Sequence, residues 1–192
     1  MVGVDVSERM LEHARRQTAD EHVSYLLADA TTYDFGAGAF DVGISRFGVM
    51  FFDDPVAAFS NLRRACGRLV MMVWQPRAEN EWARVIPDTI GEQFRDESPF
   101  TLGDPDVTRD ILTSAGFADP TFLAVHEPLY YGADTEAAYQ NVLQLREPQT
   151  LLAELDPAQA DRARAALRAM LSAYDSGDGV LFDSAAWIVS AM

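Results

Sequence analysis

Short apolar runs alternate with segments of helical periodicity over the first 76 residues of the chain. Apolar runs rich in β-branched residues predict strands at residues 1–6, 23–28, 41–45 and 69–74. Between them, capping residues and apolar positions on one face predict a helix from Ser7 and another that opens at Asp53–Pro55 and ends at Gly67. Nearly all-apolar strands that alternate with helices are typical of a parallel sheet covered on both faces. The pattern therefore predicts an α/β fold.

The remainder of the chain is richer in helical signals. Helices are predicted at residues 82–94, from Asp104–Pro105 to Gly116, and over most of residues 134–174. Strands are predicted at residues 121–125 and 185–192. No linker or repeat separates these elements, so we expect residues 1–192 to form a single domain.

Composition and charge narrow the functional classes. The 192 residues carry a net charge of −15, and all 15 basic residues are arginine, so a phosphate backbone is an unlikely ligand and a lysine nucleophile is excluded. Cys66 is the single cysteine, which rules out an internal disulfide, and the three histidines show no metal-ligand spacing. There is no apolar run of membrane-spanning length and no secretory signal, so we expect a cytoplasmic protein without membrane or nucleic-acid partners.

The residues that follow the predicted strands carry the candidate chemistry, because open α/β sheets bind ligands at the carboxyl ends of their strands. Asp5 ends the first strand, and a carboxylate there can accept hydrogen bonds from a ribose diol. Asp29 and Ala30 follow the second strand and suit an adenine ring, against which Met10 could pack. Each residue also has a structural interpretation: acidic residues at strand ends often cap helices, and methionine is common in cores.

The order of these segments resembles class I, Rossmann-like S-adenosylmethionine-dependent methyltransferases. Residues 3–11 are similar to the family's second strand and the helix after it, and residues 28–30 are similar to its adenine-contacting loop. Residues 40–52 resemble the fourth strand and the turn beside the reactive methyl group, while residues 62–70 and 104–117 resemble later elements. The resemblance covers the chain from end to end.

The resemblance implies a cofactor, S-adenosylmethionine, and a site for it. Asp5, with Val6 next to it, would bind the ribose, while Asp29 and Ala30 would bind adenine and Met10 would pack against the adenine face. Ser45 and Arg46 would line the methionine end. Residues 1–76 would form the cofactor-side half of the domain and residues 77–192 the substrate-side half, with a helical cap at about 134–181.

The acceptor implied by the resemblance is a small molecule. An apolar pocket for it would include residues 50–52, Trp82, Tyr130 and Tyr131. No catalytic base can be named; His126 and Glu127 are candidates, although a structural histidine is the simpler interpretation.

The chain departs from the family at its beginning. The family's first strand and glycine-rich turn have no counterpart, and the turn at Gly36–Gly38 comes too late in the sequence to replace them. We therefore expect an N-terminally truncated domain, in which Met1 is not the natural start and methyl transfer is impaired. We also expect the strand at residues 1–6 either to pair directly with the strand at 41–45 or to accept a partner chain, as in a homodimer.

Two other functions remain open. The chain could be a non-catalytic relic that acts by association. It could also be an NAD-dependent oxidoreductase, because Asp5 suits the ribose of NAD equally well.

Overall fold

The computed structural model describes residues 1–18, 20–91 and 96–192, and the chain divides into two compact units. The first unit holds residues 1–71, 106–121 and 189–192, and the second holds residues 72–105 and 122–188. The elements in chain order are β1 (Val2–Asp5), α1 (Glu8–Gln17), β2 (Ser24–Leu27), β3 (Gly43–Arg46), η1 (Val49–Phe51), α2 (Pro55–Ala65), β4 (Leu69–Trp74), η2 (Arg77–Glu79), α3 (Trp82–Ile90), η3 (Ser98–Phe100), α4 (Pro105–Ser114), β5 (Thr121–Val125), β6 (Leu129–Gly132), α5 (Thr135–Val142), α6 (Arg146–Ala153), α7 (Pro157–Ala173), β7 (Val180–Phe182) and β8 (Ala186–Ala191).

The N-terminal β1–α1–β2 segment forms a two-stranded parallel sheet with a helical crossover. Val2 lies opposite Ser24 and Asp5 lies opposite Leu27, so both strands end at the same edge. Helix α1 begins at the N-cap residue Ser7, whose hydroxyl accepts a hydrogen bond from the Met10 amide, and it buries Leu11.

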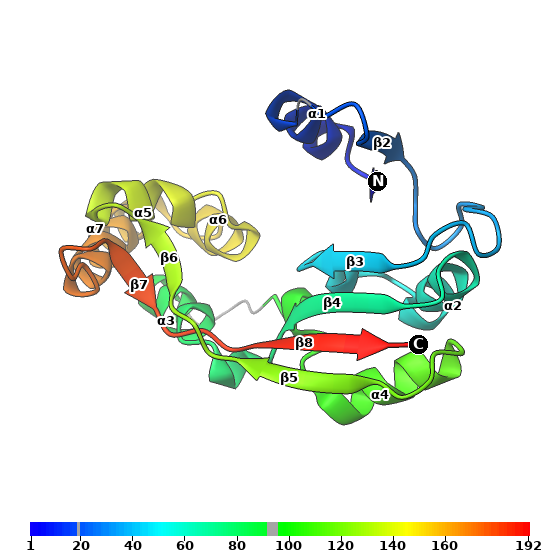
Figure 1. Cartoon of the computed structure of the whole chain (residues 1–192). Coiled ribbons are helices and arrows are strands. Elements are labelled where there is room, and N and C mark those ends of the chain that lie inside the picture. Colours follow the sequence, from blue (N-terminus) through cyan, green and yellow to red (C-terminus); the bar gives the residue numbers. More distant parts are fainter. Residues whose placement is uncertain (19, 92–95) are drawn as a thin grey trace. The chain divides into compact units, whose positions relative to one another are not determined.

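A four-stranded sheet has the order β3-β4-β8-β5 (Figure 1). Phe40 pairs in parallel with Cys66, and the Gly43 amide donates to the Arg68 carbonyl, as expected for parallel β3 and β4. Strand β8 runs opposite to β5, since Ala118 exchanges hydrogen bonds with Met192 while Thr121 reaches Ser190. Strands and helices alternate along most of the chain, and the predicted α/β fold class is confirmed.

Helix α2 supplies part of the core of the first unit. Its N-cap is Asp54, which accepts a hydrogen bond from the Ala57 amide, and Pro55 occupies the first turn, where no amide donor is needed. Ala58 and Phe59 are fully buried, and the ring of Phe59 meets Phe52 edge to face at 5.6 Å.

The second unit contains helices α3, α5, α6 and α7 and the antiparallel pair of strands β6 and β7. Their buried side chains form one apolar cluster that includes Ile86, Val142, Leu167, Leu171 and Phe182. Tyr131, which was expected to line an acceptor pocket, lies in this cluster, 5.1 Å from Phe182 between ring centroids. Burial raises the pKa of its hydroxyl.

Several sequence-based expectations need correction. Of the two alternatives for the strand at residues 1–6, direct pairing with the strand at 41–45 is not found: among the described residues β1 pairs with β2, and β3 lies at an edge of the four-stranded sheet. Pairing with a partner chain stays a prediction. Val2, Val4 and Val6 alternate along the chain and so point to the same face of the two-stranded sheet. All three are exposed rather than buried. The antiparallel pair of strands β6 and β7 was not predicted. The last part of the helix predicted at 82–94, residues 92–94, lies outside the described residues.

No helix in the described part of the chain combines the length and apolarity needed to cross a membrane.

Candidate functional site

Asp5 is the central residue of the candidate site. It is the last residue of β1, and one of its carboxylate oxygens accepts a hydrogen bond from the Ser7 amide at 2.8 Å. Its side chain is half-buried beside the N-terminus of α1, where the helix dipole favours negative charge. Within residues 1–18, 20–91 and 96–192, the second carboxylate oxygen has no hydrogen-bond partner, so it can accept a hydroxyl from a ligand.

The segment after β2 lies beside Asp5, as the strand ends predicted. The Ala28 amide donates to the Asp5 carbonyl at 3.1 Å, which fixes the start of this segment against β1. One oxygen of Asp29 accepts from the Thr31 amide at 2.8 Å, while the side chain remains exposed. The Ala30 amide donates to no other group in the part of the chain that the structure describes, and an amide donor next to a carboxylate acceptor can bind the polar edge of a purine.

A side chain from α2 holds this segment in place, a role that the sequence did not indicate. The Asn61 amide donates to the carbonyl oxygens of Ala30 at 2.8 Å and Tyr33 at 2.7 Å. The Arg64 guanidinium bonds both Asn61 and Asp34 and, with the Gly36 amide, lowers the pKa of the Asp34 carboxyl. The loop is therefore fastened to a helix of its own unit.

Val6 and Met10 have exposed side chains. Val6 follows Asp5 directly, and Met10 lies on the first turn of α1, where its backbone amide is held by Ser7. Met10 is therefore not a core residue of α1, whereas its neighbour Leu11 is buried. An exposed methionine on this turn remains free to pack against a flat ring.

Ser45 and Arg46 end β3, as the sequence predicted. Ser45 is half-buried, and Arg46 is exposed with no ion pair to any described residue. Phe47 follows in the left-handed region, with φ 57°, which is unusual for a bulky side chain and turns the chain sharply at the strand end. No strand pairing among the described residues joins β3 to β1 or β2, so the structure brings Asp5, Asp29 and Ala30 together but does not link them to Ser45 and Arg46.

Three other residues considered for chemistry are Cys66, His126 and Glu127. Cys66 is buried, its thiol donates to the Leu62 carbonyl, and burial raises its pKa. His126 and Glu127 lie after the end of β5 and are exposed, and the carbonyl of Glu127 accepts from the Ser184 hydroxyl. No group of residues in the described chain has the arrangement of a metal site.

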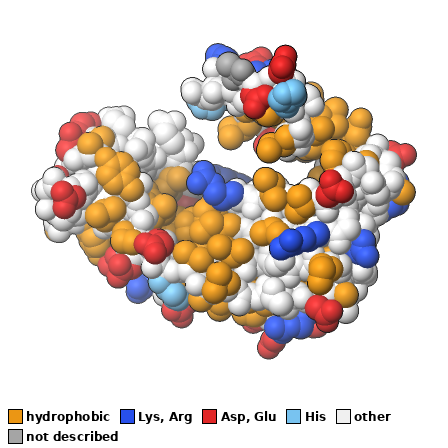
Figure 2. Space-filling view, in the orientation of Figure 1, with side chains coloured by type: hydrophobic (Ala, Val, Ile, Leu, Met, Phe, Trp, Pro, Cys, Tyr) orange, Lys and Arg blue, Asp and Glu red, His pale blue; other side chains and the backbone are white. Residues whose placement is uncertain are grey.

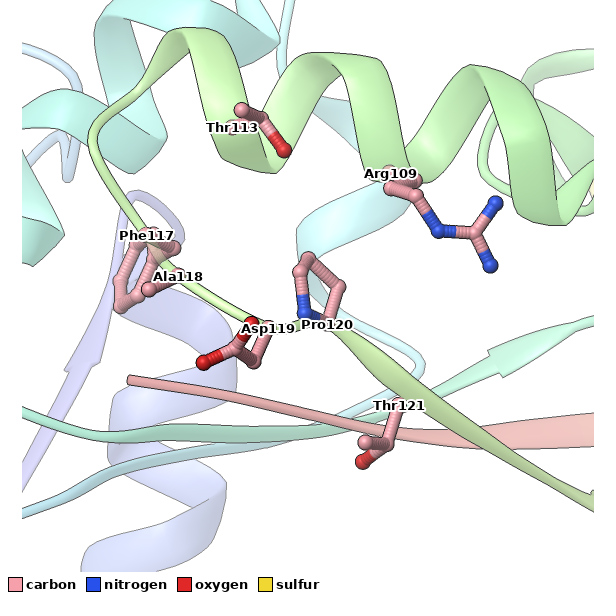
Figure 3. A pocket seen from close by; sticks show the side chains of 7 residues that line it. All are labelled: Arg109, Thr113, Phe117, Ala118, Asp119, Pro120 and Thr121. Atoms are coloured by element: carbon pink, nitrogen blue, oxygen red, sulfur yellow. The ribbon is translucent and has the colours of Figure 1, made fainter.

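A surface hollow of about 640 Å³ lies elsewhere, between α4 and the beginning of β5 (Figure 3). Its polar lining includes Arg109, Thr113 and Asp119, and Figure 3 shows that these side chains do not point toward a common centre. It adjoins the amino end of β5, whereas Asp5 and Arg46 lie at carboxyl ends of strands. The hollow therefore forms no part of the candidate site.

The N-terminal part of the chain matches a known protein family. Residues 1–68 match the model of the methyltransferase domain family. No curated protein sequence matches the chain.

Solved structures match over nearly the whole chain. A protein from Bacillus halodurans described as a methyltransferase is 16% identical, with a TM-score of 0.61, over 99% of this chain and 81% of its own. The YcgJ protein from Bacillus subtilis is 13% identical, with a TM-score of 0.62, over 99% of this chain and 80% of its own. Phosphoethanolamine N-methyltransferase 2 from Haemonchus contortus is 20% identical, with a TM-score of 0.52, over 100% of this chain and 43% of its own.

The expected resemblance to class I S-adenosylmethionine-dependent methyltransferases is confirmed. The chain has their fold, and its first 68 residues match their domain family.

Proposed function

We propose that the protein transfers a methyl group from S-adenosylmethionine to a small-molecule acceptor. The observation that carries this proposal is the open carboxylate oxygen of Asp5, held at a strand end beside the free amide of Ala30. The Haemonchus contortus enzyme was solved with S-adenosylhomocysteine and, separately, with S-adenosylmethionine, which supports the same cofactor here.

The residues fit the nucleoside end of this cofactor. Asp5 would accept hydrogen bonds from the ribose hydroxyls, with Val6 along the sugar, while Asp29 and Ala30 would bind the adenine edge and Met10 its face. Ser45 and Arg46 would line the methionine end, where the guanidinium suits a carboxylate. When bound, the cofactor supplies the electrophilic methyl group, and the protein's contribution is to position it and the acceptor.

The acceptor would bind on the substrate-side half of the chain, residues 77–192, next to the end of β4 and under the helices at about 134–181. No described side chain is assigned as a base, and transfer to an acceptor that is already nucleophilic depends mainly on proximity and orientation.

Two titrations test the cofactor. Calorimetry with S-adenosylhomocysteine and with NAD should show binding of the former and none of the latter. Tritiated S-adenosylmethionine, offered with a panel of small alcohols, phenols and amines, should then label one class of acceptor. Binding of NAD without S-adenosylhomocysteine would favour an oxidoreductase instead.

A second candidate function is association without catalysis. Val2, Val4 and Ile44 expose 37%, 37% and 69% of their surface on strands β1 and β3, and Figure 2 shows further apolar side chains exposed over the strands of the four-stranded sheet. Exposed apolar strands at sheet edges favour pairing with another chain, such as a second copy in a homodimer. A dimer by sedimentation equilibrium, together with no binding of S-adenosylhomocysteine, would support this function.

A further inference from the structure

Three aromatic rings form a row where β4 ends. Trp74 is the last residue of β4, Trp82 the first of α3, and Phe100 the last of η3. The centroids of Trp74 and Trp82 are 5.4 Å apart at an interplanar angle of 60°, and those of Trp82 and Phe100 are 5.8 Å apart at 35°. Phe100 is buried, whereas both indoles are only half-buried and so keep part of their rings accessible.

A buried amide fixes the middle of the row. Asn80 is completely buried, and its side-chain oxygen accepts from the Trp82 indole at 3.3 Å and from the Ala185 amide at 3.0 Å. Its nitrogen donates to the carbonyls of Gln75, Pro76 and Ala185 at 3.1, 3.3 and 3.2 Å. Since both ends of the amide are bonded, Asn80 cannot rotate without losing several hydrogen bonds, and the indole of Trp82 is held with it.

A paired arginine fixes the far end of the row. The guanidinium of Arg77 lies 4.8 Å from the centroid of Phe100. It bonds Glu97 at 2.7 Å and Glu147 at 3.3 Å, so its charge is already balanced. The row therefore offers a ligand rigid ring faces and no unpaired charge. Rigid aromatic side chains lose little conformational entropy when a ligand binds to them.

We propose that Trp74 and Trp82 bind the methyl acceptor, that this acceptor carries a neutral, flat, unsaturated ring, and that Asn80 is the positioning residue for Trp82. This inference rests on the proposed function and specifies its substrate class. Flat rings stack on indoles in offset or tilted geometry and gain affinity beyond their buried area, which a saturated ring of equal size does not. The carboxyl end of β4 belongs to the edge at which open α/β sheets bind ligands.

The test compares two probes of similar size, 2-naphthol and decahydro-2-naphthol, by equilibrium dialysis against the full chain. Wild type should bind 2-naphthol about three- to tenfold more tightly than the saturated alcohol. Trp74→Leu should abolish the preference. Trp82→Phe keeps a ring but removes the N–H that Asn80 holds, and it should reduce the preference without weakening the saturated probe.

Trp187→Phe is the matched control. Trp187 donates to the Gly103 carbonyl and packs on Phe122, outside the row, so its replacement should leave the preference unchanged. Because Asn80→Leu would also remove four hydrogen bonds to backbone groups and threaten folding, Trp82→Phe is the decisive variant.

Equal affinity for the two probes, or an equal loss of preference in Trp187→Phe, would overturn the inference. Its failure is distinguishable from failure of the proposed function, because dialysis needs no cofactor. If the protein transfers a methyl group but binds 2-naphthol no better than decahydro-2-naphthol, the proposed aromatic acceptor is refuted and the proposed methyl transfer is not. If the protein prefers 2-naphthol but does not bind S-adenosylhomocysteine, the proposed methyl transfer is refuted and the binding of flat rings is not.

Discussion

The side-chain amide of Asn61 donates a hydrogen bond to the carbonyl oxygen of Ala30 at 2.8 Å. A second hydrogen bond from the same amide reaches the Tyr33 carbonyl at 2.7 Å, so one residue of α2 spans the loop that follows β2. A loop that is ordered before its ligand arrives loses less conformational entropy on binding. Asn61 is thus a positioning residue for the proposed adenine site.

We therefore expect Asn61→Leu to weaken binding of S-adenosylhomocysteine by about fivefold or more, since each lost hydrogen bond is worth about 1 kcal/mol. Calorimetry measures the effect. Gln140→Leu is the matched control, because among the described residues the Gln140 amide bonds Glu136 of its own helix and no other group. An Asn61 variant that binds as tightly as the Gln140 variant would show that the loop needs no such support.

Asp5→Ala should lower the affinity for S-adenosylhomocysteine by roughly ten- to a hundredfold, the loss that follows from removing a charged hydrogen-bond partner. Asp20→Ala is a close control: Asp20 also accepts a hydrogen bond from the amide two residues later, at 2.8 Å, but it does not follow a strand. If the two variants bind S-adenosylhomocysteine with equal affinity, Asp5 only stabilises the turn through its hydrogen bond with the Ser7 amide and does not bind the ribose.

The strands were the most predictable part of the fold. The strands predicted at 69–74 and 121–125 coincide with β4 and β5, because each is a short apolar run bounded by turn residues. The burial of β1 was predicted wrongly, since an apolar run indicates a strand but does not show what covers the face to which its side chains point. Strands β6 and β7 pair with each other although they lie about 50 residues apart in the sequence. A local sequence pattern cannot predict a pairing between segments that are so far apart.

Some residues of the candidate site could be predicted from the sequence and others could not. Asp5, Asp29 and Ala30 could be found from sequence because strand ends and helix starts are local features. Asn61 and Asn80 could not, because their hydrogen-bond partners Ala30 and Ala185 lie 31 and 105 residues away. Asparagine inside a helix or turn has no pattern that marks it as a support for a distant loop.

Arg77→Met should destabilise the second unit by about 3 to 5 kcal/mol, because it removes the charged partner of the largely buried Glu147 carboxylate and leaves it the Asp96 amide, at 3.2 Å. The side chains of Arg77 and Glu147 are only 13% and 11% exposed, and Arg77 also bonds the carbonyls of Ala83 and Asp96. Urea unfolding followed by circular dichroism measures the loss.

Arg164→Met provides the contrast for Arg77. Arg164 pairs with Asp161 one helical turn away, and both are exposed, so this change should cost less than about 1 kcal/mol. Equal losses in the two variants would mean that Glu147 gains another partner when Arg77 is removed.

Tyr174 should make the stability of the second unit depend on pH in the alkaline range. Burial, and then the hydrogen bond that its hydroxyl donates to Glu81 at 2.8 Å, raise the pKa of Tyr174 above the ordinary value of 10.0. A pKa that is higher in the folded state than in the unfolded state means that the fold favours the neutral phenol. The resulting stabilisation is complete below pH 10 and is lost as the pH rises through the raised pKa of the folded protein.

Tyr174→Phe should therefore lower the free energy of unfolding by on the order of 1 kcal/mol at pH 8, the worth of the hydrogen bond to Glu81. The difference from wild type should shrink as the pH rises above 10, because wild type then loses the same bond. Burial also raises the pKa of Tyr131. Because Tyr131 is present in both proteins, its contribution to the pH dependence of stability cancels when the two free energies of unfolding are subtracted. Tyr130→Phe is the control, since Tyr130 is 56% exposed, and this variant should follow wild type throughout. Urea unfolding at a series of pH values gives the three curves, and a constant gap between Tyr174→Phe and wild type would show that Tyr174 does not titrate within the transition.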